Sequence, residues 1–511
     1  MNRHTVLRNA SANFLGKVAN RGVRVLLVPL QIKVLGEEAF GLLGLYALAA
    51  GLIAVLDLGL SITAQREVAR IAGGGRTAGQ DIRDLTRTFE LPYWLVGGLA
   101  GCAVLLSAGW FTDNWVTAPS LSRGTVTFCV TIIGLLLIAR WPVSLYRGVL
   151  YGLQRQVGTN ILAVFVETLN GVGSVAVLLI CPKVEAFFVW QLVSGIVEIA
   201  GYVWLCWRGM RQRGMPRPRF RPAIFGRVWR YALGVNAMSL IGTVFARSDG
   251  FILSKLLPIN FLGYYSIAQR APTLIGIISN SILPATTPIV VALYGQRDST
   301  ELSQLYHRQA RWLSFLSVGV AFPLAAFAYP LLRLWTQSET VANAVWLAFA
   351  LLVAASALEI ASNSVNQVSL ACGFTHPPIL VGLAEGAVVA IGTFVLAPRL
   401  GVVGAALSWS LSRVVRYASY PLLVNQLVLP GEARQWFLSD TLPIFGIGAL
   451  CFGGAWGFHR LLVGAVQSGL LWIPVALLAG SLYIGLVLSL NLIPEWRSLP
   501  HLLGIWISRS A

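Results

Sequence analysis

Residues 469–491 read GLLWIPVALLAGSLYIGLVLSLN, a run of 23 residues without a charged side chain. As a helix rising about 1.5 Å per residue, this run would be about 35 Å long, enough to cross a hydrocarbon core of roughly 30 Å. The whole sequence is 56% hydrophobic and only 11% charged, with a mean hydropathy of +0.72. A soluble domain carries about 25% charged residues, so we predict a membrane protein whose surface lipid largely covers.

Similar apolar runs recur along the chain and predict an all-α polytopic fold with about fourteen spans. Their approximate bounds are 10–34, 39–64, 89–110, 124–147, 158–181, 185–207, 231–257, 262–290, 310–333, 343–371, 378–397, 402–427, 441–462 and 469–491. The connections alternate between Arg-rich and Arg-poor, and the run from Arg208 to Arg230 is the richest. Because positive charge marks the cytoplasmic side, we predict that both termini are cytoplasmic.

The formal net charge of +18 raises the question of a nucleic-acid partner. Most basic residues are arginines at the ends of predicted spans, which is the pattern of membrane topology, so we expect no nucleic acid. The six cysteines have no metal-ligand or disulfide spacing. Walker, HExxH and GxSxG motifs are also missing from the sequence, so we predict a protein that is not an enzyme and needs no cofactor or metal.

Two halves of the chain repeat the same pattern. The series Asn13, Asn20, Arg24, Gln31 recurs as Asn236, Thr243, Arg247, Ser254, displaced by 223 residues, and Phe40-Gly41 recurs as Leu262-Gly263, displaced by 222. A repeat of six helices keeps its orientation in the membrane, so the halves would be parallel repeats. We predict lobes at 1–207 and 231–430, a basic cytoplasmic linker at 208–230, and two further helices with a cytoplasmic tail at 431–511. Chance similarity between apolar segments is the alternative.

A polar stripe runs along one face of the first span. At about 100° per residue its members fall within a sector of roughly 60°, with Arg21 at the edge. They are Asn13, Lys17, Asn20, Arg24 and Gln31. The stripe must face protein or water, because exposing Arg to lipid costs several kcal/mol.

Arginines of the two repeats are the candidates for substrate binding. Arg24 and Arg247 occupy matching positions, where two cations without a ligand would repel each other. Guanidinium groups bind phosphate oxygens in a bidentate manner, so we expect these two residues and Arg270 to bind a diphosphate anion. The neighbouring polar residues complete the predicted site: Asn13, Lys17, Asn20, Arg21 and Asn236.

Acidic residues inside the spans are the candidates for ion coupling. They are Asp57, Glu167, Glu359 and Glu385. The alternative is that each acid pairs with an embedded base and holds helices together. Glu359 is the first choice for coupling, because Asn363, Asn366 and Gln367 share its helical face.

Short motifs in both halves carry a family resemblance. They are VLGEEAFGL at 34–42, LDLGL at 56–60, REVAR at 66–70 and LGYYSIAQR at 262–270, with Pro284 beyond them. In this order and spacing the chain resembles the polysaccharide transporter family of bacterial lipid-linked oligosaccharide flippases, within the multidrug/oligosaccharidyl-lipid/polysaccharide flippase superfamily. The resemblance covers most of residues 8–430.

The resemblance implies two six-helix lobes around a central cavity that opens alternately to each side of the bacterial inner membrane. The implied cargo is a sugar chain on undecaprenyl diphosphate, destined for a surface polysaccharide such as lipopolysaccharide or for an exopolysaccharide. Membrane lipid, a polysaccharide polymerase and a chain-length regulator are the implied partners. In the relative that flips the peptidoglycan precursor, basic residues on the first and eighth helices are functionally important. The matching positions here are Arg21 or Arg24, and Arg270. Two further helices of that relative are thought to form a lipid-tail groove, which the last two spans here could also form.

Three other functions compete with this one. A flippase for the peptidoglycan precursor belongs to the same class with a different cargo. A drug/cation antiporter of the multidrug extrusion family normally has twelve spans and acidic sites. A polysaccharide polymerase or ligase would be an enzyme, but the short outward connections and the internal repeat count against it.

Overall fold

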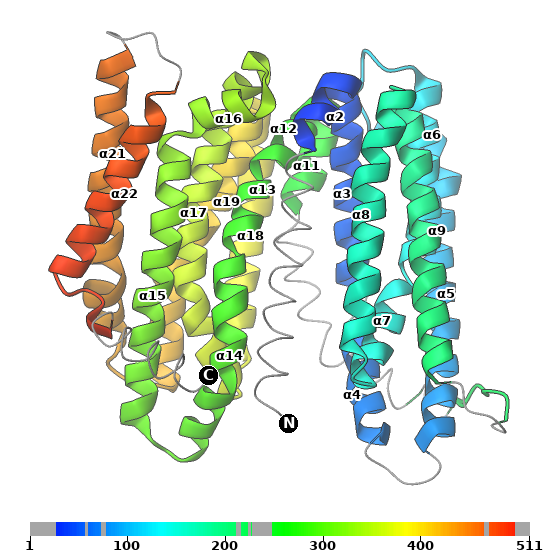
Figure 1. Cartoon of the computed structure of the whole chain (residues 1–511), viewed down its shortest axis with the longest axis horizontal. Coiled ribbons are helices and arrows are strands. Elements are labelled where there is room, and N and C mark those ends of the chain that lie inside the picture. The colour runs from blue at the N-terminus through cyan, green and yellow to red at the C-terminus, as the bar shows by residue number, and fades with distance from the viewer. Residues whose placement is uncertain are drawn as a thin grey trace, which may run out of the picture. The chain divides into compact units, whose positions relative to one another are not determined.

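The structure is a computed structural model (Figure 1), and it describes residues 27–56, 60–72, 78–210, 216–222, 226, 248–463 and 470–495. These residues form helices joined by turns and short connections, and no strand occurs among them. The long apolar helices confirm the predicted all-α, multi-pass membrane fold.

The chain divides into two compact units, Met1–Ser266 and Ile267–Ala511. The described helices of the first unit are α2 (Val28–Leu35), α3 (Glu37–Leu56), α4 (Leu60–Ala72), α5 (Ala78–Asn114), α6 (Arg123–Arg140), α7 (Val143–Gly152), α8 (Gln156–Ile180), α9 (Val184–Gly209), α11 (Ser248–Leu256) and α12 (Ile259–Ala268). The end of α12 continues into the second unit. The lobe bounds of 1–207 and 231–430 remain predictions.

The described helices of the second unit run from α13 to α22. In chain order they are α13 (Arg270–Ile275), α14 (Ile277–Gly295), α15 (Ser299–Ala326), α16 (Ala328–Thr336), α17 (Glu339–Ala371), α18 (His376–Leu400), α19 (Val402–Leu427), α20 (Ala433–Gln435), the π-helix η1 (Trp436–Thr441), α21 (Leu442–Val463) and α22 (Trp472–Ser489). Those that lie beyond residue 430, where the predicted repeat ends, are α20, η1 and the two long helices α21 and α22.

Local sequence features determine several helix ends. The side chains of Ser122, Asp298 and Ser338 accept hydrogen bonds from the backbone N–H groups three residues later, and so cap α6, α15 and α17. Pro142 cannot donate a backbone hydrogen bond and stands between α6 and α7. Gly401, with φ of +59°, makes the turn between α18 and α19.

Within the described residues, eight helices are long and apolar enough to cross a membrane, or up to ten if each of two bent helix pairs is one span. One such pair is α15 and α16, which meet at a bend of 74°. Much of the predicted first and seventh spans lies outside the described residues. The count of fourteen therefore stays a prediction.

Each unit has its own buried core, and apolar side chains also cover its outside. Tyr146 and Tyr202 lie in the core of the first unit, and Tyr306 and Trp436 in that of the second. On α21 and α22, by contrast, large apolar side chains point outward, including Leu461, which is 78% exposed. A surface of this kind is stable against lipid rather than water.

Candidate functional site

A buried group of charges lies where α18 and α19 pack together. Arg413 Nη1 donates to Glu385 Oε1 at 2.8 Å, and Arg416 Nη1 donates to Glu385 Oε2 at 3.2 Å. Glu385 is 4% exposed and Arg413 is 6% exposed. Both carboxylate oxygens thus accept charge-assisted hydrogen bonds, which compensate for the loss of water around the three charges. We refer to these three residues and Glu359 as the α17–α19 charge cluster.

Small residues let the helices approach closely enough for these side chains to meet. A Cβ atom at Gly404 would lie 2.4 Å from the carbonyl oxygen of Leu396, so only glycine fits there. The two arginines are three residues apart and share one face of α19. Aromatic rings of the same helix flank their guanidinium groups: Arg413 Cζ lies 4.6 Å from the ring centroid of Trp409, and Arg416 Cζ lies 5.2 Å from that of Tyr420.

Glu359 is the more accessible acid of the cluster. Its side chain is 34% exposed, and its Oε2 lies 3.7 Å from Arg413 Nη1. Arg416 also donates to Asn363 Oδ1 at 3.1 Å, one turn along α17 from Glu359. The cluster therefore contains one acid held firmly by two arginines and one acid that can still exchange partners.

Most of the predicted polar face of α17 binds neighbouring helices. Asn363 Nδ2 donates to Ser279 Oγ at 3.2 Å, and Gln367 Nε2 donates to the carbonyl oxygen of Leu283 at 2.6 Å, both on α14. Tyr420 of α19 donates to Asn366 Oδ1 at 2.6 Å. These bonds favour a structural role for the three amides and leave Glu359 as the candidate for coupling.

The first unit has an intramembrane ion pair of its own. Arg140 of α6 places its Nε 3.5 Å from Glu198 Oε2 of α9, and its Nη2 donates to Ser194 Oγ at 3.2 Å. Arg140 also donates to the hydroxyl of Tyr46 on α3. A Cβ atom at position 195 would lie 3.1 Å from Arg140 Nε, so Gly195 leaves the space that the guanidinium occupies.

Helices α11 and α12, which fall in the predicted second repeat, pack against α3. A Cβ atom at Gly41 would lie 2.2 Å from the carbonyl oxygen of Ile259, and one at Gly263 would lie 3.1 Å from the backbone nitrogen of Gly41. Buried Asp249 accepts from the hydroxyl of Tyr265 at 2.5 Å, which connects α11 to α12.

A third charged group, which we call the His307 cluster, was not predicted from the sequence. It consists of His307 and Arg311 on α15, Glu432 before α20, Asp440 in η1 and Glu495 after α22. The spacing of four residues between His307 and Arg311 places them on one helix face, which was the only available signal. The acids that meet them come from more than 120 residues later, and no local pattern connects them.

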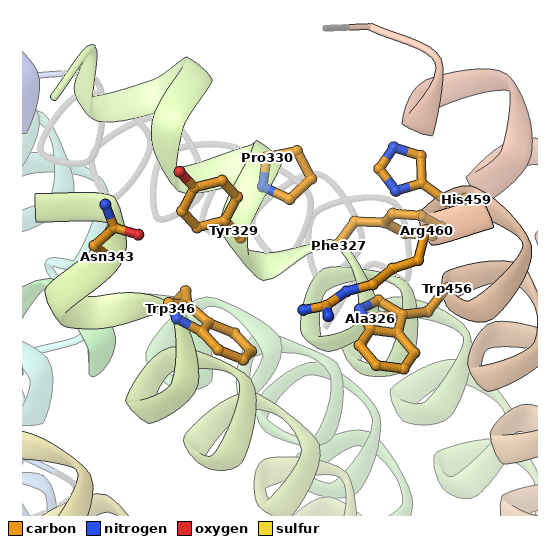
Figure 2. Close-up of a pocket in the computed structure, with 9 residues that line it drawn as sticks. All are labelled: Ala326, Phe327, Tyr329, Pro330, Asn343, Trp346, Trp456, His459 and Arg460. Atoms are coloured by element: carbon orange, nitrogen blue, oxygen red, sulfur yellow. The ribbon is translucent and has the colours of Figure 1, made fainter. Parts of the chain in front are cut away.

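A cavity of about 380 Å³ lies at the bend between α15 and α16 (Figure 2). Figure 2 shows Arg460 extending from α21 toward Trp346 of α17, with Tyr329 of α16 on the same cavity. Arg460 Cζ lies 4.7 Å from the ring centroid of Trp456. The aromatic rings here can stack on a sugar ring, and the guanidinium beside them can bind an anionic group.

The structure tests only part of the predicted site. The residues that lie outside the described part of the chain are Asn13, Lys17, Asn20, Arg21, Arg24, Asp57, Asn236 and Arg247. Arg270 is half-buried at the start of α13, and Glu167 is half-buried on α8. Within the described residues, no group of three or more His, Cys, Asp or Glu side chains is placed to hold a metal ion. The substrate and coupling roles of all these residues remain predictions.

Comparison with known families supports the resemblance found in the sequence. A family model described as "Polysaccharide biosynthesis protein" matches residues 6–294, which is more than half of the chain. A second model, MatE, matches residues 237–395. The two matches together reach from the first predicted span to the predicted eleventh.

Two similar proteins align with most of the chain. The succinoglycan biosynthesis transport protein ExoT of Rhizobium meliloti (strain 1021) is 22% identical over 454 residues, which cover 87% of this chain and 82% of ExoT. The uncharacterized membrane protein EpsK of Bacillus subtilis (strain 168) is 22% identical over 450 residues, which cover 85% of each chain.

Solved structures show the same fold at low identity. The lipid II flippase MurJ in an inward closed conformation aligns with a TM-score of 0.69 and 10% identity, and covers 97% of this chain and 100% of that chain. An inward-facing multidrug resistance MATE family transporter aligns with a TM-score of 0.62 and 15% identity, and covers 81% of this chain and 96% of that chain. With the family match over more than half of its length, the chain belongs to the polysaccharide biosynthesis protein family of multi-pass membrane transporters.

Proposed function

We propose that this protein is a flippase that moves oligosaccharide repeat units linked to undecaprenyl diphosphate across the bacterial inner membrane. The repeat units would serve the synthesis of a surface polysaccharide or exopolysaccharide. The family match over residues 6–294 carries the proposal, because it ties this membrane fold to polysaccharide synthesis. The similarity to a succinoglycan transport protein over 87% of the chain supports it.

The predicted substrate-binding arginines suit an anionic cargo. Arg270 is half-buried at the start of α13. Arginine binds diphosphate oxygens in a bidentate manner, so Arg270, with Arg24 and Arg247, could receive the carrier diphosphate as the transporter alternates its access. Arg413 and Arg416 add no net positive charge, because Glu385 binds both of them and Glu359 Oε2 lies 3.7 Å from Arg413 Nη1.

Two further candidates each have a specific observation in their favour. The chain-long similarity to MurJ favours a peptidoglycan-precursor flippase, and the MatE match at 237–395 favours a drug/cation antiporter. In the first case depletion of the protein lyses the cells, and in the second it sensitises them to toxic cations. Loss of polysaccharide with otherwise normal growth is expected only for the leading proposal.

Transport by the purified protein tests the proposal directly. The protein is reconstituted into vesicles with a fluorescent oligosaccharide on undecaprenyl diphosphate, and an impermeant quencher reports the fraction of label in each leaflet. We expect transfer between leaflets faster than in vesicles without protein. Transfer at the protein-free rate for this cargo, together with transfer of the peptidoglycan precursor or export of a cationic dye, would replace the proposal with the corresponding alternative.

A further inference from the structure

His307 lies between two carboxylates in the interior of the second unit. Its Nδ1 is 2.5 Å from Asp440 Oδ2, and its Nε2 is 3.0 Å from Glu432 Oε2. The side chains of His307 and Asp440 are 4% and 1% exposed, and that of Glu432 is 31% exposed. Both ring nitrogens are therefore within hydrogen-bond distance of an acidic oxygen.

This geometry requires one more proton than a neutral histidine with two carboxylates can supply. A neutral imidazole has one N–H donor and one bare nitrogen, whereas an ionised carboxylate only accepts. One of the two contacts would then bring a nitrogen lone pair against a carboxylate oxygen. Both contacts become hydrogen bonds when one extra proton is present, either on the ring or on one of the carboxyl groups. The three groups thus share that proton, and its binding belongs to the group as a whole.

The surrounding charges favour the extra proton. Arg311 Nη1 donates to Asp440 Oδ1 at 3.0 Å, and its Nη2 donates to Glu495. The His307 cluster thus contains three carboxylates and one guanidinium, so a second positive charge on the ring is stabilised. Ser303 donates to the other oxygen of Glu432 at 3.0 Å.

The remaining groups near His307 leave this balance in place. Tyr306 touches the imidazole with its ring, at a centroid separation of 5.3 Å, and is uncharged at neutral pH. Helix α14 packs against α15 and contains no Asp, Glu, Lys, Arg or His. A cavity of about 630 Å³ adjoins the cluster, and Glu301 and Arg308 also line it. The cavity gives water a place beside His307 from which a proton can arrive.

We propose that His307, Asp440 and Glu432 form a proton-binding site, and that the bound proton stabilises the packing of α15 against the segment from Glu432 to η1. Asp440 belongs to the π-helix η1, which leads directly into α21, and such π-turns are frequent at functional sites. Glu432 lies just before α20. The site therefore connects α15, a helix of the predicted repeat, with η1 and the segment before α20, which lie beyond it, and it would bind a proton whatever cargo is carried.

Release of the proton would first break the contact between His307 and Glu432. Asp440 is fully buried and also held by Arg311, so it keeps the remaining N–H of His307. The bare Nε2 would then repel the carboxylate of Glu432, which is partly exposed and can turn toward water. The proton stabilises the closed contact, so the contact is complete at low pH and is lost as the pH rises.

Hydrogen–deuterium exchange tests this in the purified full-length protein. After correction for the chemical exchange rate, we expect exchange of the backbone at 429–441 to increase between about pH 6 and about pH 9. The expected increase is roughly tenfold or more, the scale of one lost charge-assisted hydrogen bond. In Glu432→Gln the side-chain amide would donate to Nε2 of a neutral His307. Backbone exchange at 429–441 should therefore be equally slow at every pH in this variant.

Glu301→Gln is the matched control, because Glu301 lines the same cavity without contacting His307, and it should keep the wild-type pH dependence. His307→Gln, which removes the titrating ring, should also show no pH dependence and provides a second variant if the first folds poorly. Wild-type protein whose exchange at 429–441 does not change with pH would overturn the proposal. So would a Glu432→Gln or His307→Gln variant that follows the wild-type profile.

Discussion

Gly41 of α3 and Gly263 of α12 lie against each other, although 222 residues separate them in the sequence. The two glycines occupy equivalent positions in the predicted repeat. The contact is tight because neither residue has a side chain: a Cβ atom at Gly41 would lie 2.2 Å from the carbonyl oxygen of Ile259.

Gly41→Ala should therefore lower the stability of the protein. The backbone carbonyl that the new methyl group meets cannot turn aside as a flexible side chain would, so α12 has to move. Overpacking of this kind costs about 1–3 kcal/mol. The temperature at which the detergent-solubilised protein loses its monodisperse chromatographic peak should fall.

Gly51→Ala, on the same helix, is the control for that experiment. A Cβ atom at Gly51 would meet nothing within 4 Å, and alanine is the better helix former. Its melting temperature should equal or exceed that of the wild type. Equal melting temperatures for Gly41→Ala and Gly51→Ala would show that the contact between α3 and α12 is not tight.

The two glutamates of the α17–α19 charge cluster should respond differently when they lose their charge. Glu385→Gln leaves Arg413 and Arg416 without the carboxylate that both bind, and breaking a buried pair in this way costs about 3–5 kcal/mol. We expect little of this variant in the membrane. Glu359→Gln removes a charge that is 34% exposed and 3.7 Å from Arg413, so its abundance should be normal.

If Glu359 is the coupling residue, Glu359→Gln should also change the response of polysaccharide export to collapse of the proton or sodium gradient. Export and membrane abundance are measured on the same cells. Glu339→Gln, whose ion-pair partner Arg333 is 4.0 Å away at an exposed position, is the control and should match the wild type. An unaltered gradient response in Glu359→Gln would exclude it from coupling, and normal abundance of Glu385→Gln would contradict its structural role.

The sequence was sufficient to predict the membrane fold because burial in lipid leaves a strong local signal. An apolar run such as 469–491 has few alternatives to a spanning helix, and α22 occupies most of that run. The polar face of α17 was also predictable, because residues three and four apart share a helical face whatever the helix packs against. Sequence spacing could not tell which neighbours that face would meet.

Long-range pairings were the part that the sequence could not supply. Glu385 was a candidate for coupling, but only the packing of α18 on α19 brings it to Arg413 and Arg416. His307 received no role, because its partners come from far along the chain: Glu432 lies before α20, and Asp440 lies in a π-helix that has no sequence signature. Charged residues inside a membrane mark a site, but their partners depend on helix packing.

The predicted topology places the connection at 208–230 in the cytoplasm and the end of α16 outside. Arg-rich connections stay on the cytoplasmic side, and the connection after Thr336 contains no basic residue before α17 begins. A green fluorescent protein fused after Arg221 should therefore fluoresce, and alkaline phosphatase fused after Thr336 should be active. Phosphatase activity at Arg221, or fluorescence without phosphatase activity at Thr336, would reverse this orientation.

The last prediction concerns Arg24, Arg247 and Arg270, which we expect to bind the carrier diphosphate. Each guanidinium could donate charge-assisted hydrogen bonds worth about 1.5–3 kcal/mol, so losing one should weaken cargo binding roughly ten- to a hundredfold. Arg→Lys keeps the charge but loses the planar fork, and should fall between wild type and Arg→Ala.

A purely structural role for these arginines predicts a different pattern, in which Arg→Ala lowers the amount of protein in the membrane by leaving a buried acid unpaired, and Arg→Lys largely restores it. Membrane abundance and polysaccharide export, measured together for each variant, separate the two roles. Reduced export at normal abundance supports diphosphate binding, whereas normal export at normal abundance in both Arg24→Ala and Arg247→Ala would exclude it. Arg399→Ala is a suitable control, because Arg399 is an exposed arginine in the last turn of α18 and lines neither of the two cavities described, so it should leave export unchanged.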